Sequence, residues 1–538
     1  MKDFDRFGIM LDCSRNGVRT VSALHRLIRL ISRMGYNTLM LYIEDTYEVN
    51  GQPYFGYMRG RYSTDELREI DRFAAAHGIE VIPCIQTLAH LNGIVNWPVY
   101  TDYVDCNDIL LAGDERTYRL IDDMFSALER SFTSRIVNIG LDEAHMVGLG
   151  RYLEKNGYQN RYEIFMRHLE RVREIAGAHG FRILMWSDMF FRFHNHGGYQ
   201  MENPLVPDEL PKTVPQDVRL IYWDYYDWGR NDAHYNDMFR AHSKFSNEIW
   251  YAGGAWTWSG FSPRNYLSEK VTGIALPLCR KYGVRNVVMT MWGDDGCTCS
   301  VFAALPALFY AAELARGNTD MELIKKRFQA LFDIPYDAFK LLDLPGMVGG
   351  DNGWLKNPEK YMLFSDPFLG MYDSTVVPGD GVRYAEFSKA MEPWTAHPEW
   401  GRLFAAEKAL CDVLARKYEL GLKLRGAYSG KDRAGLERCA ALCRETAELV
   451  LRFCECFRTQ WMEENKAYGF ETQELRLGGL ALRLRSCAQR VDAYLRGELT
   501  QIEELEEPLL DYEGGGSVFA QKPVYQLLWR QIATPNLL

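Results

Sequence analysis

The chain has 538 residues, 47% of them hydrophobic and 25% charged, a mixture that is typical of folded globular proteins and excludes extensive disorder. Its 62 Lys and Arg residues against 72 Asp and Glu residues give a net charge of −10, which argues against nucleic acid as a general partner. No apolar run reaches the roughly 18 residues that a membrane span requires.

The first 320 residues alternate short apolar runs with longer amphipathic stretches. Each apolar run is continuous, which is typical of a parallel strand buried on both faces. The predicted strands are Phe7–Leu11, Thr38–Ile43, Glu80–Ile85, Arg135–Gly140, Arg182–Trp186, Arg219–Trp223, Glu248–Ala252 and Asn286–Met291. Helical stretches separate most of them, so residues 1–320 predict an α/β fold, a closed (β/α)₈ barrel that forms the catalytic domain. An open doubly wound sheet is the alternative, but no GxGxxG follows the first strand.

The rest of the chain is predicted to be irregular and then helical. Residues 321–385 read as an irregular connecting region, and residues 386–538 as an α-helical C-terminal domain. Three amphipathic segments, at 398–427, 432–465 and 471–496, predict an antiparallel helical bundle. Apolar side chains cover more than one face of the second segment, so we expect the bundle to dock on the barrel and to help form a homodimer. The alternative is a monomer whose bundle packs only on its own barrel.

The 12 cysteines include no CxxC pair, and the chain start, Met1–Asp5, has no signal-peptide pattern. We therefore expect reduced, buried thiols in a cytoplasmic protein. A metal centre is not expected either, because His90 and His145 are the only histidines directly after predicted strands.

Carboxylates and aromatic rings follow the predicted strands, where the active site of a barrel lies. These residues are Asp12 and Arg15, Glu44 and Asp45, Gln86 and His90, Asp142, Glu143 and His145, Trp186 and Asp188, Tyr222 to Tyr226, Trp256 and Trp258, and Trp292, Asp294 and Asp295. Helix N-caps also favour Asp after a strand, but they do not explain repeated Trp-x-Asp and Tyr-x-Asp spacings. Carboxylates accept hydrogen bonds from hydroxyls and flat rings cover C–H faces, so the pattern predicts a polyhydroxylated substrate.

The adjacent pair Asp142-Glu143 is the sharpest local feature. Two-carboxylate glycosidases need carboxyl groups about 5–5.5 Å or 6.5–9.5 Å apart, on opposite sides of the scissile bond. Sequence neighbours approach from the same wall of a pocket, so they fit an acid and a partner that handles another part of the substrate. Substrate-assisted glycosidases, in which the 2-acetamido oxygen of the sugar attacks, are the known exception to the two-carboxylate scheme.

Residues 139–145 read Ile-Gly-Leu-Asp-Glu-Ala-His, which resembles the Gly-x-Asp-Glu-x-His signature of the family-20 glycoside hydrolases, the β-N-acetylhexosaminidases. The resemblance extends over residues 7–295. The first strand ends in an Asp-x-x-Arg pattern, residues 222–224 resemble the family's Tyr-x-Asp, and residues 292–294 resemble its Trp-x-Glu with Asp in place of Glu. The helical C-terminal region resembles that of the shorter bacterial members.

The resemblance implies a role for each matching residue. Glu143 would be the general acid and then the base, Asp142 would bind the acetamido N–H, and Tyr222 would orient the acetamido oxygen. His90 would pair with the acid, with Asp45 as its carboxylate partner, although the second strand lacks the family's His and two adjacent Asp. The residues implied in substrate binding are Arg15, Trp186, Asp224, Trp256, Trp292 and Asp294.

The implied activity is that of an exo-acting β-N-acetylhexosaminidase, which removes terminal GlcNAc or GalNAc from a glycan through an oxazolinium ion and needs no cofactor or metal. Two alternatives stay open. One is a retaining glycosidase of other specificity, with Glu143 as acid/base and Asp294 or Asp188 as nucleophile. The other is a non-catalytic glycan-binding barrel.

Overall fold

The structure is a computed structural model that describes residues 3–226, 233–349, 356–512, 514 and 526–538. The chain forms two compact units. The first comprises residues 1–255, 267–292 and 307–319, and the second comprises residues 256–266, 293–306 and 320–538. Each unit is described by itself below.

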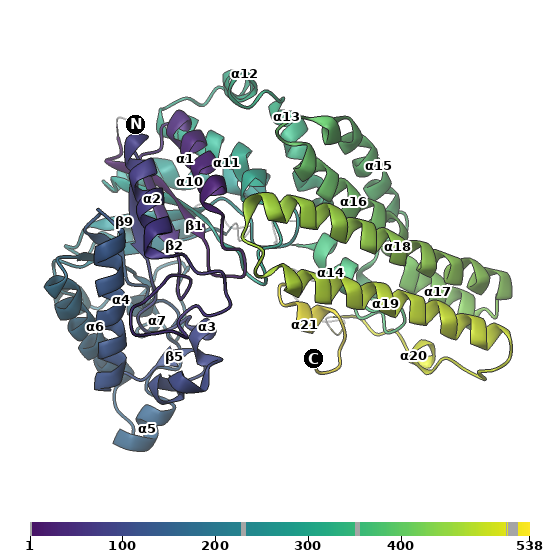
Figure 1. Cartoon of the computed structure of the whole chain (residues 1–538), viewed down its shortest axis with the longest axis horizontal. Coiled ribbons are helices and arrows are strands. Elements are labelled where there is room, and N and C mark those ends of the chain that lie inside the picture. The colour runs from purple at the N-terminus through teal and green to yellow at the C-terminus, as the bar shows by residue number, and fades with distance from the viewer. Residues whose placement is uncertain (1–2, 227–232, 350–355, 513, 515–525) are drawn as a thin grey trace. The chain divides into compact units, whose positions relative to one another are not determined.

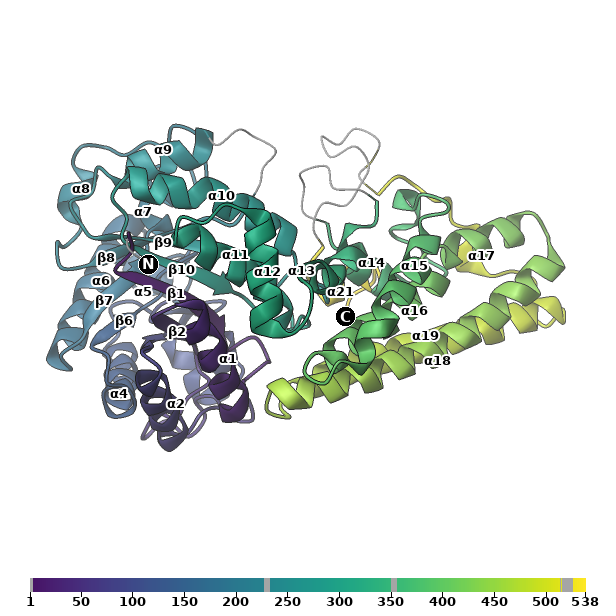
Figure 2. The ribbon, with the colours of Figure 1, turned by 90° about the horizontal axis from the view of Figure 1, so that it is seen from above.

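The first unit is a closed barrel of parallel strands in the order β1-β10-β9-β8-β7-β6-β3-β2 (Figures 1 and 2). This confirms the predicted barrel. Its strands are β1 (Arg6–Asp12), β2 (Thr38–Tyr42), β3 (Glu80–Cys84), β6 (Ile136–Asn138), β7 (Arg182–Trp186), β8 (Arg219–Trp223), β9 (Ile249–Gly254) and β10 (Asn286–Met291). A small antiparallel pair, β4 (Val104–Cys106) and β5 (Ile109–Leu110), stands apart from the barrel sheet.

Amphipathic helices cover the outside of the barrel (Figure 2). The longer ones are α1 (Val21–Met34), α2 (Thr64–Ala76), α4 (Glu115–Ser131), α6 (Arg161–Ala178), α9 (Ala233–His242), α10 (Asn265–Lys281) and α11 (Leu305–Ala315). Local chemistry sets their ends: Ser63 and Glu66 form a capping box at the start of α2, and Gly35 ends α1 in the left-handed conformation. Short helices lie in the connections: α3 (Asn92–Val95), α5 (Arg151–Asn156), α7 (Asp188–Arg192), α8 (Leu210–Thr213), η1 (Pro98–Tyr103) and η2 (Val301–Ala304).

The second unit is helical (Figure 1). Its four bundle helices are α16 (Gly401–Lys417), α17 (Leu420–Ser429), α18 (Arg433–Glu464) and α19 (Phe470–Leu495). The segment 321–385, predicted to be irregular, contains α12 (Met321–Phe332), α13 (Tyr336–Phe339), η3 (Lys340–Met347), α14 (Pro358–Phe364) and η4 (Asp373–Thr375), and α15 (Gly381–Met391) begins in it. The remaining helices of the unit are η5 (Glu392–Ala396), α20 (Glu503–Glu506) and α21 (Trp529–Ile532).

The apolar stripe of α18 is covered within its own unit. Phe453 and Phe457 contact Phe261, with ring centroids 5.2 and 5.6 Å apart, and Phe457 and Trp461 contact Phe470 at 5.5 and 5.6 Å. Since Phe453, Phe457 and Trp461 are at most 2% exposed, they do not require a second chain to cover them. The homodimer therefore stays a prediction from sequence.

The segments that follow β9 and β10 belong to the helical unit. Within it, Asp295 forms ion pairs with Lys360 at 2.8 Å and with Arg476 at 3.0 Å. Two glycines permit close approach: a Cβ at Gly260 would lie 2.2 Å from Glu359 Oε1, and one at Gly296 would lie 2.7 Å from Gln473 Nε2. These contacts fix the two segments against helices that lie far along the chain.

The 12 cysteines are free thiols, and all except Cys106 and Cys456 are buried. Their packing agrees with the expected role of small apolar residues. Across the described ranges, none of the helices is both long enough and apolar enough to cross a membrane.

Candidate active site

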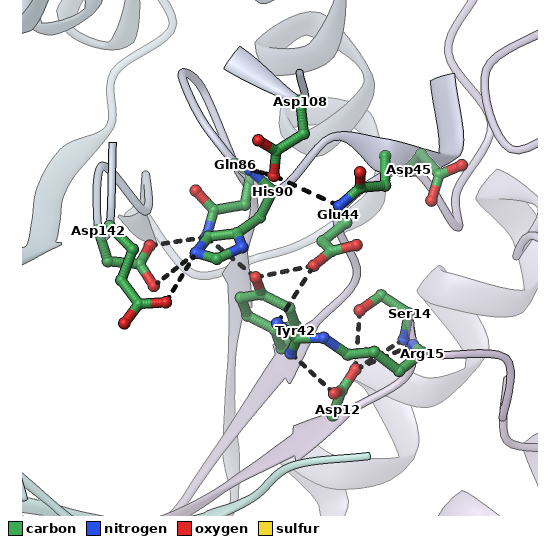
Figure 3. A network of polar contacts seen from close by, with 12 residues as sticks. Asp12, Ser14, Arg15, Tyr42, Glu44, Asp45, Gln86, His90, Asp108 and Asp142 are labelled. Carbon is green, nitrogen blue, oxygen red and sulfur yellow. Dashed lines mark hydrogen bonds and ion pairs between the residues drawn. The ribbon is translucent and has the colours of Figure 1, made fainter. Parts of the chain in front are cut away.

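A continuous polar network lies at the carboxyl ends of β1, β2, β3 and β6 (Figure 3). The backbone turns sharply here: Glu44, His90, Leu141 and Glu143 have φ values of 33°, 59°, 67° and 51°. The left-handed region is uncommon for residues with a side chain, and such strained residues concentrate at functional sites. The turns direct polar side chains toward one another.

Asp142 is the central anion of the network. Its side chain is buried, with Oδ2 at 3.3 Å from His90 Nε2 and Oδ1 accepting a hydrogen bond of 2.8 Å from Gln86 Nε2. Burial alone would raise the pKa of Asp142, but the charge and hydrogen bond of His90, together with Gln86, hold that pKa below its ordinary value. Burial would also lower the pKa of His90, and the Asp142 carboxylate outweighs it, raising that pKa to about 9. The pair is therefore ionised at neutral pH.

Gln86 links this ion pair to a second carboxyl group. Its amide nitrogen donates to the Tyr42 hydroxyl at 2.9 Å as well as to Asp142, and Tyr42 donates to Glu44 Oε1 at 2.9 Å. Gly140 leaves the space for this amide, because a Cβ there would lie 1.9 Å from Gln86 Oε1. The glycine of the 139–145 motif is thus explained by packing.

Glu143 lies beside the ion pair and is more accessible. Its side chain is 40% exposed, and its carboxyl oxygens lie 3.4 Å from Arg192 Nη2 and 3.8 Å from His90 Nε2. Its backbone N–H donates to Asp188 Oδ2 at 3.1 Å. A carboxyl group that faces solvent next to a buried anion can exchange a proton with a bound molecule.

Arg15 and Glu44 form the other end of the network. The Arg15 guanidinium pairs with Asp12 at 2.9 Å, lies 3.7 Å from Glu44 Oε1, and stacks over the rings of Tyr42 and Trp292 at 4.9 and 4.8 Å. Burial raises the pKa of Glu44 to about 7, although Arg15 opposes that shift. This cluster offers both donors and acceptors to a hydroxylated ligand.

Asp45 differs from the expectation that it partners His90. It is fully buried and pairs with Arg59 at 3.0 Å. The carboxylate paired with His90 is Asp142, at 3.3 Å, and the charge of Glu44 makes a smaller contribution that also raises the pKa of His90.

Aromatic rings line the same end of the barrel. Trp186 and Trp292 have ring centroids 6.0 Å apart, and Tyr42 meets Trp292 edge to face at 4.8 Å. Tyr225 accepts a hydrogen bond from the Trp292 side chain and stacks on Trp223 at 5.4 Å. Burial raises the pKa of the Tyr225 hydroxyl, and the negative charge of Asp142 raises it further. The hydroxyl therefore stays protonated.

Tyr222 and Asp224 lie on the other side of β8, facing α9. The Tyr222 ring stacks on His242 with centroids 4.6 Å apart, and its hydroxyl donates to Asp224 Oδ2 at 2.9 Å. Asp224 in turn lies 3.3 Å from His234 Nε2. Tyr222 therefore packs toward α9, and its role at the acetamido group stays a prediction from sequence.

The sequence does contain a pattern that points to Tyr225. Residues 225–227 read Tyr-Tyr-Asp, a second Tyr-x-Asp spacing directly after the first. Asp227 lies outside the described residues. Tyr42 and Arg192 had no such signal, since one is inside a predicted strand and the other is four residues beyond Asp188 in α7.

Trp256 and Asp294 belong to the helical unit, in the segments that follow β9 and β10. Trp256 is buried and stacks on Trp258 with centroids 3.9 Å apart, and Asp294 is half-buried. The barrel unit itself brings together the predicted residues Arg15, His90, Asp142, Glu143, Trp186 and Trp292.

Asp188 is a poor nucleophile in this arrangement. It is fully buried, and its Oδ2 accepts hydrogen bonds from the Glu143 N–H and from Arg192 Nε at 2.8 Å. Burial and the charge of Asp142 raise its pKa to about 7. Over the ranges that the structure describes, His, Cys, Asp and Glu side chains form no group of three or more that could hold a metal ion.

Two family models match the chain. "Glycosyl hydrolase family 20, catalytic domain" matches residues 4–241, and "Glycoside Hydrolase 20C C-terminal domain" matches residues 336–522. Hexosaminidase D of Homo sapiens is 24% identical over 216 residues, which cover 38% of this chain and 42% of that protein. Beta-hexosaminidase of Emericella nidulans is 28% identical over 255 residues, covering 40% of this chain and 39% of that protein.

The chain thus spans less than half the length of these two relatives. Among solved structures, the chitobiase of Flavobacterium johnsoniae is 15% identical and has a TM-score of 0.48. That similarity covers 82% of this chain and 75% of the chitobiase chain.

We predict that Gly140→Ala lowers kcat/KM on an aryl N-acetylglucosaminide by about 10²-fold, because the new Cβ displaces the Gln86 amide from Asp142. Gly78→Ala is the matched control, since Gly78 has a similar φ of 73° but open space around the added Cβ. We expect the control to lose about 1–2 kcal/mol of stability and to keep its turnover. Equal loss of turnover in both variants would contradict the role given to Gly140.

Proposed function

Since the chain belongs to glycoside hydrolase family 20, we propose that it is an exo-acting β-N-acetylhexosaminidase that removes terminal, non-reducing GlcNAc or GalNAc from a glycan. The observation that carries this proposal is the pairing of a buried, ionised Asp142 with a half-exposed Glu143. A fixed anion inside a low-dielectric pocket stabilises positive charge that develops on a neighbouring group. The 2-acetamido group of the substrate is such a group.

In the first step, the protonated Glu143 carboxyl donates its proton to the glycosidic oxygen as the bond from that oxygen to C1 breaks. The acetamido oxygen attacks C1 and forms the second ring of an oxazolinium ion. Asp142 accepts a hydrogen bond from the acetamido N–H and stabilises the positive charge. His90 and Gln86 keep the Asp142 carboxylate ionised and oriented for this task.

In the second step, the Glu143 carboxylate takes a proton from water as the water oxygen attacks C1. The bond from C1 to the acetamido oxygen breaks, and the acetamido group returns to its neutral form. Two displacements at C1 retain the β-configuration. No group outside the substrate and these side chains is needed for the proton balance.

We assign orientation of the acetamido oxygen to Tyr225 in place of Tyr222. The supporting observations are the hydrogen bond between Tyr225 and Trp292 and the influence of Asp142 on the Tyr225 hydroxyl. Holding the attacking oxygen in line with C1 is an entropic contribution, which is large when the geometry is correct. Trp186 and Trp292 supply flat faces for the sugar ring.

Arg15 and Glu44 are proposed to bind ring hydroxyls. The guanidinium and the carboxylate lie 3.7 Å apart, so one hydroxyl can accept a hydrogen bond from Arg15 and donate one to Glu44. The substrate contact that the family resemblance implies for Asp294 stays a prediction from sequence. The natural partner would be an N-acetylhexosamine-terminated oligosaccharide.

A retaining glycosidase with a separate carboxylate nucleophile is less well supported. Asp188 bonds the backbone of Glu143, so the two groups approach from one side of the pocket. The homodimer and the cytoplasmic location stay predictions from sequence.

We predict that aryl β-GlcNAc or β-GalNAc is hydrolysed and that the matching aryl β-glucoside is not, because the nucleophile belongs to the substrate. A thiazoline that mimics the oxazoline should inhibit strongly. Rates are measured by release of the aryl group. Comparable turnover of the glucoside would support a protein nucleophile, and binding without turnover of any glycoside would support the non-catalytic reading.

We predict that Glu143→Gln slows substrates with poor leaving groups by about 10²–10⁴-fold and activated aryl substrates far less, because only the former need protonation. Asp142→Asn should slow all acetamido substrates alike, since it removes the charge that stabilises the oxazolinium ion. The ratio of rates on a natural disaccharide and on a dinitrophenyl glycoside is the measurement. Full activity of Glu143→Gln on the disaccharide would exclude Glu143 as the acid.

We predict that Tyr225→Phe lowers kcat on acetamido substrates by about 10²-fold, because the hydroxyl that aims the acetamido oxygen is lost. Tyr222→Phe is the matched control, since it removes a hydroxyl that donates to Asp224 on the other side of β8. We expect the control to change thermal stability more than kcat. The opposite ranking of kcat would return the role to Tyr222.

A further inference from the structure

Two side chains of the short helix α7 hold Glu143 at both its backbone and its carboxyl group. Asp188 begins α7 and Arg192 ends it, so their side chains lie one turn apart on the same face. Arg192 Nε donates to Asp188 Oδ2 at 2.8 Å, and the Glu143 backbone N–H donates to the same oxygen at 3.1 Å. Arg192 Nη2 donates to Glu143 Oε1 at 3.4 Å, which closes a ring of contacts. We call Asp188 and Arg192 the α7 clamp.

The α7 clamp is itself fixed by its surroundings. The Asp188 side chain is fully buried and that of Arg192 is only 14% exposed. Arg192 Nη1 donates to the Gly197 carbonyl at 3.0 Å, and the Gly197 N–H donates to the Arg192 carbonyl at 2.9 Å. The guanidinium also lies over the rings of Tyr199 and Trp223, 5.7 and 6.0 Å from their centroids. A planar guanidinium that is already held loses little conformational entropy when it binds one more group.

The clamp distinguishes the two carboxyl oxygens of Glu143. Arg192 donates a hydrogen bond to Oε1, whereas His90 Nε2 lies 3.8 Å from Oε2, which is too long for a hydrogen bond. The carbonyl oxygen of a neutral carboxyl group is its better acceptor, so the contact with Arg192 favours a proton on Oε2. Since the Glu143 side chain is 40% exposed, Oε2 can meet a bound molecule.

We propose that Arg192 is a positioning residue for Glu143. This inference rests on the proposed function, in which Glu143 is the acid and then the base. Arg192 holds Oε1 and Asp188 holds the backbone N–H, so the carboxyl group keeps one orientation and presents Oε2 to the substrate. Oε2 gives its proton to the glycosidic oxygen in the first step and takes a proton from water in the second.

The test uses the leaving group to separate orientation from stability. Arg192→Gln is assayed in the full-length protein on a β-linked GlcNAc disaccharide, whose leaving group needs protonation, and on dinitrophenyl β-GlcNAc, whose leaving group does not. We expect kcat/KM to fall about 10²-fold on the disaccharide and less than about tenfold on the dinitrophenyl substrate, because a misplaced acid affects only the former. A general loss of stability would leave the ratio of the two values unchanged.

Arg316→Gln is the matched control. Arg316 also pairs with a fully buried carboxylate, that of Glu313, and also donates to a backbone carbonyl, that of Met34. Met34 ends α1 just before β2 begins, so this pair lies at the amino end of the barrel, away from Glu143. We expect Arg316→Gln to keep the wild-type ratio of kcat/KM values.

Two further variants test whether Arg192 acts through Glu143. In a Glu143→Gln background, Arg192→Gln should leave the ratio of kcat/KM values unchanged, because no acid remains to be oriented. Arg192→Lys should behave like Arg192→Gln, since an ammonium group cannot reproduce the planar fork that bonds both Asp188 and Glu143.

Three results would overturn the proposal. Equal losses on both substrates in Arg192→Gln would mean a structural role. Additive losses in the double variant would mean that Arg192 acts on the substrate without Glu143. Full recovery of the ratio in Arg192→Lys would mean that a positive charge suffices and that orientation by the fork is unnecessary.

Failure of the proposed function is distinguishable from failure of the positioning role. If the wild type hydrolyses no acetamido glycoside, crystal structures of the wild type and of Arg192→Gln replace the kinetic measurement. A Glu143 carboxyl group that turns or takes two orientations in Arg192→Gln would support the positioning role alone. A carboxyl group that keeps its wild-type orientation would refute it.

Discussion

A carboxylate that stays ionised in a buried position constrains the whole carboxyl end of the barrel. Asp142 is 8% exposed, and an isolated buried carboxylate would take up a proton instead of staying charged. His90 and Gln86 prevent this, and each needs support of its own. His90 is held in a left-handed turn by a hydrogen bond from its backbone N–H to Asp108 at 3.0 Å, and Gln86 is held by Tyr42. The turns after β2, β3 and β6 thus hold the residues that keep the Asp142 carboxylate ionised.

The barrel could be predicted because its strands are buried on both faces and read as continuous apolar runs. β7, β8 and β10 begin and end at the predicted residues, whereas β6 ends at Asn138 because the turn at Gly140 begins there. The helices within 321–385 were missed because several are only one or two turns long. Such helices depend on tertiary packing, and their sequences carry little periodicity.

Sequence indicated the positions of two kinds of candidate site residue. Asp142 and Glu143 are adjacent within one motif, and Arg15 and His90 follow the ends of predicted strands. The sequence does not give the direction in which a side chain points. Tyr222 and Tyr225 both fit a Tyr-x-Asp spacing, but Tyr222 lies in β8 and packs toward α9, whereas Tyr225 follows the strand and stacks on Trp223. The contribution of Gln86 could not be predicted either, since it depends on contacts between three strand ends.

The membership of residues 256–266 and 293–306 in the helical unit bears on how this protein can be divided. A gene fragment ending at residue 319 would encode every barrel strand, yet it would strip Phe261 of its partner Phe453 and leave Asp295 without Lys360. Exposing a phenylalanine side chain that is buried in the full-length chain costs roughly 1.5–3 kcal/mol. The C-terminal domain therefore cannot be removed cleanly at residue 319, and exchanging it between homologues would require exchanging residues 256–266 and 293–306 with it.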